Sequence, residues 1–327
     1  MNMNFYQTFG INVDLALEAH EIVRGELGRE IPGVILDREK YEHASVTIVN
    51  IKEESAEQTM GKPRGNYITI EAPALRENDR LAQQEVAEIL AKKIASLFNL
   101  PEGANVLVVG LGNWNATPDA LGPRVVGRTM VTRHLYNYAP EEICGGMRSV
   151  SALAPGVLGI TGIETAEIIK GVVEKTRPEL IIVVDALAAG SVERIATTIQ
   201  IADTGISPGS GIGSQRAGIN KESMGAPVIA IGIPTVVHAA VIARNTVDQV
   251  IEKFKSTPVL DQTCKHMRPD FIEGAIQEVL APFAGNLMVT PKEIDTLIQN
   301  TAKVVAGGIS MALHPSITVE DYTLYLN

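Results

Sequence analysis

Residues 105–123 read NVLVVGLGNWNATPDALGP, and residues 180–191 read LIIVVDALAAGS. Each segment begins with a short apolar run rich in β-branched residues, and each delivers an aspartate after that run, Asp119 in the first and Asp185 in the second. Such runs are typical of buried strands in a parallel sheet. The carboxyl ends of parallel strands meet at one edge of the sheet, where ligands collect. The sequence therefore predicts that two carboxylates far apart in the chain share one crevice.

Strand-like and helix-like patterns alternate along most of the remaining chain. The expected strands lie at 105–110, 180–184, 196–202 and 227–233, and the expected helices at 15–27, 81–98, 118–136, 163–175, 235–255 and 290–313. This alternation predicts an α/β fold, with a mainly parallel sheet flanked by helices on both faces. Residues 31–75 differ, because three short alternating segments there are separated by charged and Gly/Pro turns. They predict a small β-rich N-terminal subdomain.

Composition and charge exclude several classes of protein. The chain of 327 residues is 45% apolar and 20% charged, as in an ordinary globular protein. Its net charge of −10 argues against direct nucleic acid binding, which needs Lys and Arg in excess. The N-terminus does not read as a secretory signal, and the longest apolar stretch, residues 228–243, is too short to span a bilayer. We therefore expect a soluble, cytoplasmic protein that binds neither nucleic acid nor a membrane.

The turn after the first of the two strands contributes polar residues to the predicted crevice. Its glycines let the backbone approach something closely, and Asn113, Trp114 and Asn115 would line the crevice. Alone, Asp119 could merely complement a helix dipole, and Asp185 could merely cap a helix. As a pair they would share a proton, because two neighbouring carboxylates do not both ionise easily. One could then activate water while the other polarises a carbonyl.

Two glycine-rich segments resemble nucleotide-binding motifs only in part. The Gly-x-Gly after residue 109 lacks the third glycine of a dinucleotide fingerprint, and residues 203–214 lack the Lys-Ser/Thr ending of a phosphate loop. We therefore expect no cofactor, and we interpret residues 203–214 as a mobile loop beside the cleft. His238 follows another strand end, where we expect it to pack under the crevice as part of a helix.

Several long segments resemble the spore germination protease family, and the resemblance runs from about Asn12 to Leu313. The segments are the two quoted above, SALAPGVLGITGIET at 151–165, TTIQIADTGISPGSG at 197–211, PVIAIGIPTVV at 227–237 and GNLMVTPKE at 285–293. The resemblance implies an endopeptidase of spore-forming bacteria that degrades small acid-soluble spore proteins during germination, within the forespore and spore core. It also implies an atypical aspartic peptidase, made as a zymogen and assembled as a homotetramer. Its two essential aspartates correspond by motif to Asp119 and Asp185.

The resemblance also implies a site of self-cleavage. Family substrates are cut after an acidic residue and before a large apolar one, with Ala next and Glu a little further on. The segment from Asp14 and Leu15 to Glu18, DLALE, has this form. We predict cleavage between Asp14 and Leu15, which divides the chain into a propeptide of residues 1–14 and a single peptidase domain of residues 15–327. Asp14 could at the same time cap the helix that follows.

Further site residues are less sharply defined. Asp119, at a predicted helix N-terminus, is the better candidate for the base, and backbone N–H groups near 110–115 could stabilise an oxyanion. Arg124, Arg128 or Arg194 could receive the acidic flanks of a substrate, and spacing does not choose among them.

Two other interpretations stay open. Residues 105–126 and 180–186 also resemble, more loosely, the hydrogenase maturation endopeptidases, which implies a fold of that kind. On that interpretation Asp119, Asp185 and His238 would form a metal site of mixed oxygen and nitrogen ligands; otherwise we expect no metal. The third interpretation is a non-catalytic spore protein whose crevice binds a peptide without cutting it.

Overall fold

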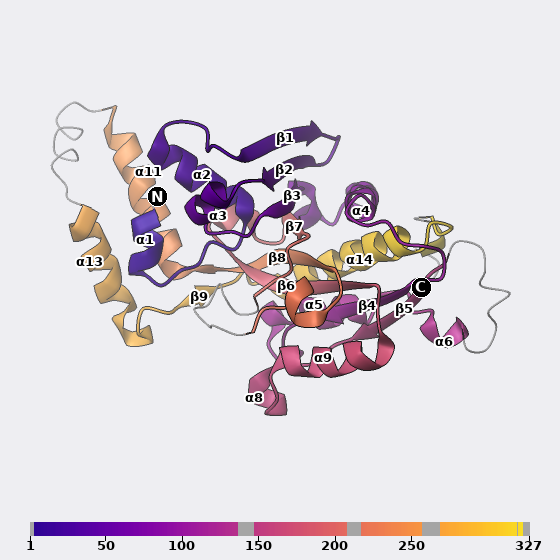
Figure 1. Cartoon of the computed structure of the whole chain (residues 1–327). Helices are drawn as coiled ribbons and strands as arrows, with labels where there is room; N and C mark the ends of the chain where they lie inside the picture. Colours follow the sequence, from indigo (N-terminus) through magenta and orange to yellow (C-terminus); the bar gives the residue numbers. More distant parts are fainter. Residues whose placement is uncertain (1–2, 137–146, 208–216, 257–268, 319, 323–327) are drawn as a thin grey trace.

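The computed structural model describes residues 3–136, 147–207, 217–256, 269–318 and 320–322 (Figure 1). Most of the glycine-rich segment 203–214 lies outside them. The described residues form one nine-stranded sheet in the order β1-β2-β3-β7-β8-β6-β4-β5, with β9 paired to β8. The strands are β1 Val34–Lys40, β2 Ser45–Ile51, β3 Gly65–Glu71, β4 Asn105–Gly110, β5 Ser149–Leu153, β6 Leu180–Ala189, β7 Thr198–Ala202, β8 Val228–His238 and β9 Met288–Val289.

Helices cover both faces of this sheet (Figure 1). The α-helices are α1 Met3–Thr8, α2 Ala16–Leu27, α3 Glu54–Met60, α4 Arg80–Ala95, α5 Leu121–Val126, α6 Arg133–Tyr136, α8 Leu158–Thr161, α9 Thr165–Thr176, α10 Lys221–Met224, α11 Ala239–Phe254, α13 Pro269–Leu280 and α14 Ile294–Leu313. Short 3-10 helices are η1 Pro73–Glu77, η2 Thr117–Asp119, η3 Val192–Arg194 and η5 Ala281–Phe283. None of the helices in the described ranges combines the length and apolar character that a membrane span requires.

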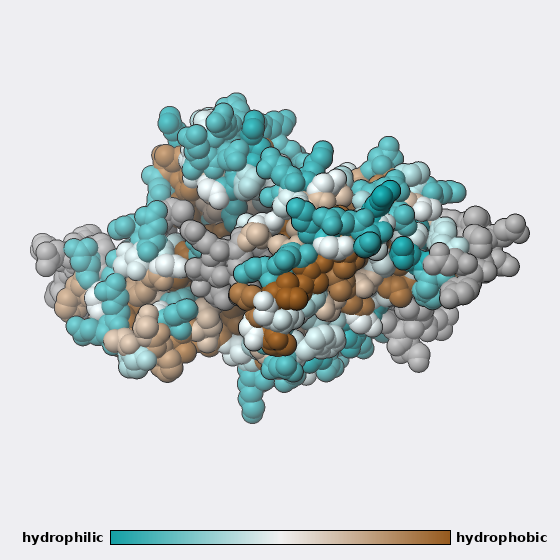
Figure 2. Space-filling view, turned by 60° about the horizontal axis from the view of Figure 1, so that its bottom comes forward, coloured by the Kyte–Doolittle hydropathy of each residue, from teal (hydrophilic) through white to brown (hydrophobic). Residues whose placement is uncertain are grey.

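The central strands are buried on both faces, as their apolar runs predict. Along β4, Val106 and Val108 join a core shared with α4, α5 and α14. Leu107 and Val109, which point the other way, join a second core shared with α9 and α10. Side chains alternate across a strand, so a continuous apolar run feeds both layers. The predicted α/β fold with helices on both faces is therefore confirmed. In the view of Figure 2 the surface is largely hydrophilic, and apolar surface gathers near the middle of that face.

The sheet has a parallel part and an antiparallel part. Strands β5, β4, β6 and β8 lie side by side and parallel. Beyond β8 the sheet continues antiparallel through β7, β3, β2 and β1, so the strands of the β-rich segment 31–75 extend the same sheet. Strand β7 reverses direction because only residues 190–197 separate it from β6, too few for the crossover that a parallel strand needs.

Close backbone contacts between β4 and α5 explain the glycines of the first motif. A Cβ atom on Gly110 would overlap the carbonyl of Gly122 on α5. Gly112 has a φ of +116°, and a Cβ atom there would overlap the carbonyl oxygen of Asp119. These glycines therefore approach the chain's own backbone. They fold the turn back on itself, so that Asp119 lies beside Asn113.

Candidate active site

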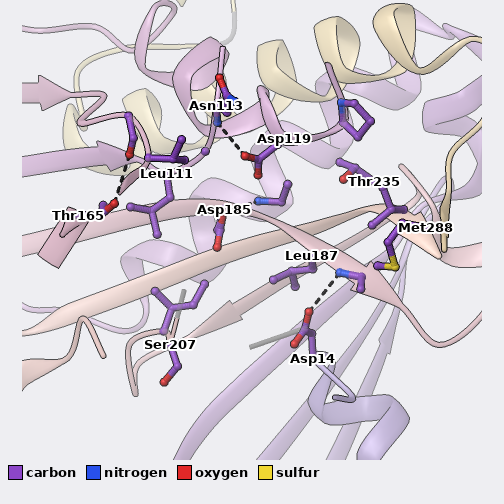
Figure 3. Close-up of a pocket in the computed structure, with 18 of the residues that line it drawn as sticks. Asp14, Leu111, Asn113, Asp119, Thr165, Asp185, Leu187, Ser207, Thr235 and Met288 are labelled. Carbon is purple, nitrogen blue, oxygen red and sulfur yellow. Dashed lines mark hydrogen bonds between the residues drawn. The ribbon is translucent and has the colours of Figure 1, made fainter. Parts of the chain in front are cut away.

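A cleft of about 490 Å³ lies at the carboxyl ends of β4 and β6 (Figure 3). Asp119, from the turn after β4, and Asp185, within β6, both line it. The two carboxylates that the sequence places after separate strands therefore reach one space. The other lining residues are Asp14, Leu111, Gly112, Asn113, Pro118, Gly156, Val157, Gly159, Thr165, Ala186, Leu187, Ala188, Ile206, Ser207, Thr235, Val236 and Met288.

The Asp119 side chain is held by the turn that precedes it. The N–H of Asn113 donates to Oδ2 of Asp119 at 2.9 Å and to its carbonyl oxygen at 3.0 Å. Asp119 closes η2, and the next helix, α5, begins after Ala120 without a side-chain cap. Asp119 therefore ends a short 3-10 helix and does not lie in the first turn of the long helix expected at 118–136. A backbone donor on a carboxylate instead fixes its orientation and stabilises its charge.

Asp185 lies inside a strand and not at its end. Strand β6 continues to Ala189, and Asp185 is paired with Gly232 of β8. The residue is 8% exposed, and its Oδ1 accepts the N–H of Ala186 at 2.9 Å. No helix follows directly, so the helix-cap interpretation of Asp185 is wrong. The residue presents a largely buried carboxylate to the cleft, close to the point where β4 stops.

Asp14 is a third carboxylate in the cleft. It is 9% exposed, and its Oδ2 accepts the N–H of Ala188 at 3.1 Å (Figure 3). Its carbonyl oxygen accepts from Nζ of Lys62 at 2.9 Å and from Nε2 of Gln200 at 3.3 Å. Helix α2 begins at Ala16 with Leu15 as an N-cap that makes no side-chain bond. The expectation that Asp14 caps this helix is therefore wrong, because its side chain reaches across to β6.

A charged cluster anchors the first turn of α2. Both carboxylate oxygens of Glu18 accept the N–H of Gly190 at 3.1 Å, and Nε of Arg194 lies 3.4 Å from Oε1. Burial raises the pKa of Glu18 to about 7, against the opposing effects of Arg194 and the Gly190 N–H. Burial lowers the pKa of Lys62, while the charges of Asp14 and Glu18 act in the opposite direction.

Most of the side chains predicted to line the cleft are elsewhere. Arg194 is not among the lining residues, because Glu18, Glu21 and Glu71 engage its guanidinium. Arg124 extends to Asp295, at 3.9 Å. Arg128 donates to the Arg124 carbonyl. Trp114 is 55% exposed and does not line the cleft, and Asn115 is exposed and donates its N–H to Asn113. Leu15, after the predicted cleavage site, is fully buried. Of the side chains predicted to accompany the two aspartates in the cleft, only Asn113 lines it.

The alternative metal site does not assemble. His238 borders a separate cavity of about 470 Å³ with Phe9 and Asn286. Its Nδ1 accepts the N–H of Ala240 at 3.1 Å as the N-cap of α11, and burial lowers its pKa. Within the described ranges, no three His, Cys, Asp or Glu side chains are grouped so that they could hold a metal ion. The ligand set of Asp119, Asp185 and His238 is therefore wrong.

Sequence reasoning missed the groups that hold the N-terminal segment. Lys62 lies in a charged turn and Gln200 on β7, and neither carries a motif. The backbone N–H groups that bind Asp14 and Glu18 belong to Ala188 on β6 and to Gly190 just after it, and they have no sequence signal. The one available clue was the acidic pair of the DLALE segment, because buried acids require donors.

Comparison with known proteins supports an assignment. The solved structure of the [NiFe] hydrogenase maturation protease HycI from Thermococcus kodakarensis KOD1 covers 44% of this chain and 80% of that chain, at 21% identity and a TM-score of 0.30, a likeness too loose to bear on the site. Germination proteases of Caldanaerobacter subterraneus subsp. tengcongensis, Clostridium tetani and Bacillus cereus are 52%, 47% and 42% identical, each over 97% of this chain and 97–99% of their own. The family model for germination protease matches residues 14–273 and 268–326. The chain belongs to the germination protease family.

Proposed function

We propose that the protein is an endopeptidase that hydrolyses peptide bonds in the cleft between Asp119 and Asp185, without a covalent intermediate. Family membership indicates a protease that acts in spore germination. The observation that carries the mechanism is that two carboxylates from distant segments line one cleft. Such a pair supplies a proton acceptor and a proton donor in the same place, which is what water-mediated hydrolysis requires.

The two aspartates have different roles in this proposal. Asp119, whose carboxylate receives the Asn113 N–H, is the base that takes a proton from the attacking water. Asp185 carries the shared proton and polarises the scissile carbonyl as the water oxygen adds to its carbon. The C–N bond then breaks, and the departing nitrogen takes a proton, which leaves a carboxylic acid and an amine.

We further propose that the full-length chain is a zymogen that cleaves itself between Asp14 and Leu15. Asp14 lies in the cleft, and three anchors hold it there: the N–H of Ala188, Nζ of Lys62 and Nε2 of Gln200. While residues 1–14 stay in place, another peptide cannot occupy the same part of the cleft. Loss of the propeptide would therefore open the site to a substrate.

The remaining parts of the proposal rest on the family. We propose small acid-soluble spore proteins as substrates, the forespore and spore core as the location, and a homotetramer as the assembled form. Neither a cofactor nor a metal has a role in this mechanism, and neither nucleic acid nor a membrane is a proposed partner.

The proposal is tested by incubating the purified protein, under conditions that activate it, with a small acid-soluble spore protein and following the products on a gel and by mass spectrometry. Asp119→Asn and Asp185→Asn should each lose cleavage, by a factor on the order of a thousand or more. Asp295→Asn, a change at an exposed aspartate, should cleave like the wild type. Substantial activity in both site variants would refute the assignment. Binding without cutting would instead favour a peptide-binding spore protein.

A further inference from the structure

One edge of β6 lacks a strand partner just beyond Asp185. Strand β4 pairs with β6 as far as Gly110 and Val184, and Leu111 adds one more bond to the Val184 carbonyl. Strand β6 then runs on to Ala189, still paired with β8 on its other side. Within the described residues, no strand pairs with β6 on the β4 side after Val184. This edge forms part of the wall of the cleft, because Ala186, Leu187 and Ala188 line it.

The direction of the backbone groups on this edge follows from the pairing. Alternate residues of a strand direct their N–H and C=O groups to opposite sides. Since the Val184 carbonyl faces β4, the N–H groups of Ala186, Ala188 and Gly190 face that same side. The register with β8 shifts after Leu187, but the extra residue belongs to β8, so the alternation of β6 is kept.

All three of these N–H groups donate to carboxylates. Ala186 donates to Oδ1 of Asp185 at 2.9 Å, and Ala188 donates to Oδ2 of Asp14 at 3.1 Å. Gly190 donates to both oxygens of Glu18 at 3.1 Å. A Cβ atom on Gly190 would lie 2.8 Å from Oε2 of Glu18, so a glycine is what lets this carboxylate come so close. In the full-length chain, Asp14 at the end of the predicted propeptide and Glu18 on α2 therefore take the place of a neighbouring strand.

We propose that peptide substrates bind as an added β-strand along this edge of β6, and that Asp14 occupies the N–H of Ala188 until residues 1–14 leave. Glu18 lies on α2, beyond the predicted cleavage site, and keeps the N–H of Gly190. Buried N–H groups need acceptors, and an extended peptide presents carbonyls at the spacing of alternate strand residues, roughly 6.6 Å. Strand addition of this kind draws its affinity from the main chain. The inference rests on the proposed function, because a strand added along this edge would bring one of its peptide bonds to Asp185, where the proposed hydrolysis takes place.

The test uses the full-length chain with two substitutions. Asp119→Asn stops the proposed cleavage, and Asp14→Ala frees the N–H of Ala188. The probe is a synthetic peptide with the sequence of residues 10–20, and isotope-labelled alanine reports amide exchange at single residues by NMR. Added peptide should slow exchange at Ala188 by about tenfold or more. Exchange at Ala189, whose N–H faces β8, should not change, and the matched chain that keeps Asp14 should show no effect at the same peptide concentration.

A second measurement varies the peptide and not the protein. Peptides methylated at one backbone nitrogen at a time should lose about tenfold in affinity at alternate positions and little in between, because a strand offers every second N–H to its neighbour. Three results would each overturn the inference. They are no binding at millimolar peptide, binding that leaves amide exchange at Ala188 unchanged, and equal losses of affinity for peptides methylated at every position.

Neither measurement depends on cleavage, so the two proposals can fail separately. A chain that binds peptides along β6 but cuts no protein would refute the proposed endopeptidase and support the inference. A chain that cuts spore proteins, but binds the methylated peptides without alternating losses of affinity, would support the endopeptidase and refute the inference.

Discussion

The Asp14 carboxylate lies 3.1 Å from the backbone nitrogen of Ala188, three residues along β6 from Asp185. An acidic side chain of the N-terminal segment is thus bound in the same cleft as the two proposed catalytic aspartates. The Asp14 carbonyl oxygen in addition accepts from Lys62, in the turn before β3, and from Gln200 on β7. The N-terminal segment is therefore docked by specific contacts, which makes its stability measurable.

Phe5→Ala should release this segment without unfolding the sheet. Phe5 is fully buried in a core shared with α11 and α13, and truncating a buried Phe costs about 3–5 kcal/mol. A short terminal segment cannot absorb that loss and should undock. Limited proteolysis within residues 1–14 should become faster, whereas Gln7→Ala, at an exposed position of the same helix, should not change it. Equal proteolysis rates in the two variants would contradict the account.

Glu18 should make the stability of the full-length chain depend on pH. Its pKa is about 7 in the folded chain against 4.5 as the ordinary value, so the folded state holds the proton more tightly. The stability that this gives is fully present below about pH 4.5 and is lost as the pH rises to about 7, a change of about 3 kcal/mol at most. The measurement is the free energy of unfolding in urea across this range.

Glu18→Gln is the control for this pH dependence. His20, His238 and His314 have lowered pKa values, so they contribute a dependence of the opposite sign in the same range. Only the difference between wild type and Glu18→Gln isolates the glutamate. If this difference stayed constant between about pH 4.5 and pH 7, the raised pKa would be wrong.

Gly112→Ala should impair cleavage by displacing Asp119. The new Cβ atom would overlap the Asp119 carbonyl, and the positive φ at this position disfavours alanine. We expect a loss of stability of about 1–3 kcal/mol and a loss of cleavage of about 100-fold. Gly127→Ala is the matched control, because a Cβ atom there would meet its nearest neighbours at 3.7 Å. Cleavage rates and urea unfolding of both variants give the comparison, and similar behaviour of the two would count against the role of the turn.

The sequence predicts the centre of the sheet well because the signal there is local. The apolar runs of β4 and β6 mark strands buried on both faces, and their acids reach one cleft. The end of β8 is harder to predict. Residues 235–255 are expected to be helical, yet the strand continues through Pro234 to His238, because its β-branched residues find a partner in β6. Only that partner decides between helix and strand.

Side-chain partners from distant segments are beyond what spacing can predict. Arg194 is a predicted candidate for substrate binding, but its partners Glu18 and Glu21 lie on α2, near the N-terminus. The last helix is expected to begin at residue 290, but the Thr290 hydroxyl donates to the Thr235 carbonyl and α14 begins at Ile294. In an irregular turn, side chains of adjacent residues can also point in different directions: Asn113 lines the cleft, whereas Trp114 is exposed to solvent. A local pattern marks a functional region without showing which way each side chain points.

The central claim is that Asp119 and Asp185 act as one catalytic unit, and a double-mutant cycle tests it most directly. The measurement is kcat/KM for cleavage of a small acid-soluble spore protein by the wild type, by Asp119→Asn, by Asp185→Asn and by the double variant. Residues that work together lose activity non-additively, so the double variant should be about as active as the less active single variant. Losses that multiply, or a single variant with nearly wild-type activity, would contradict the claim.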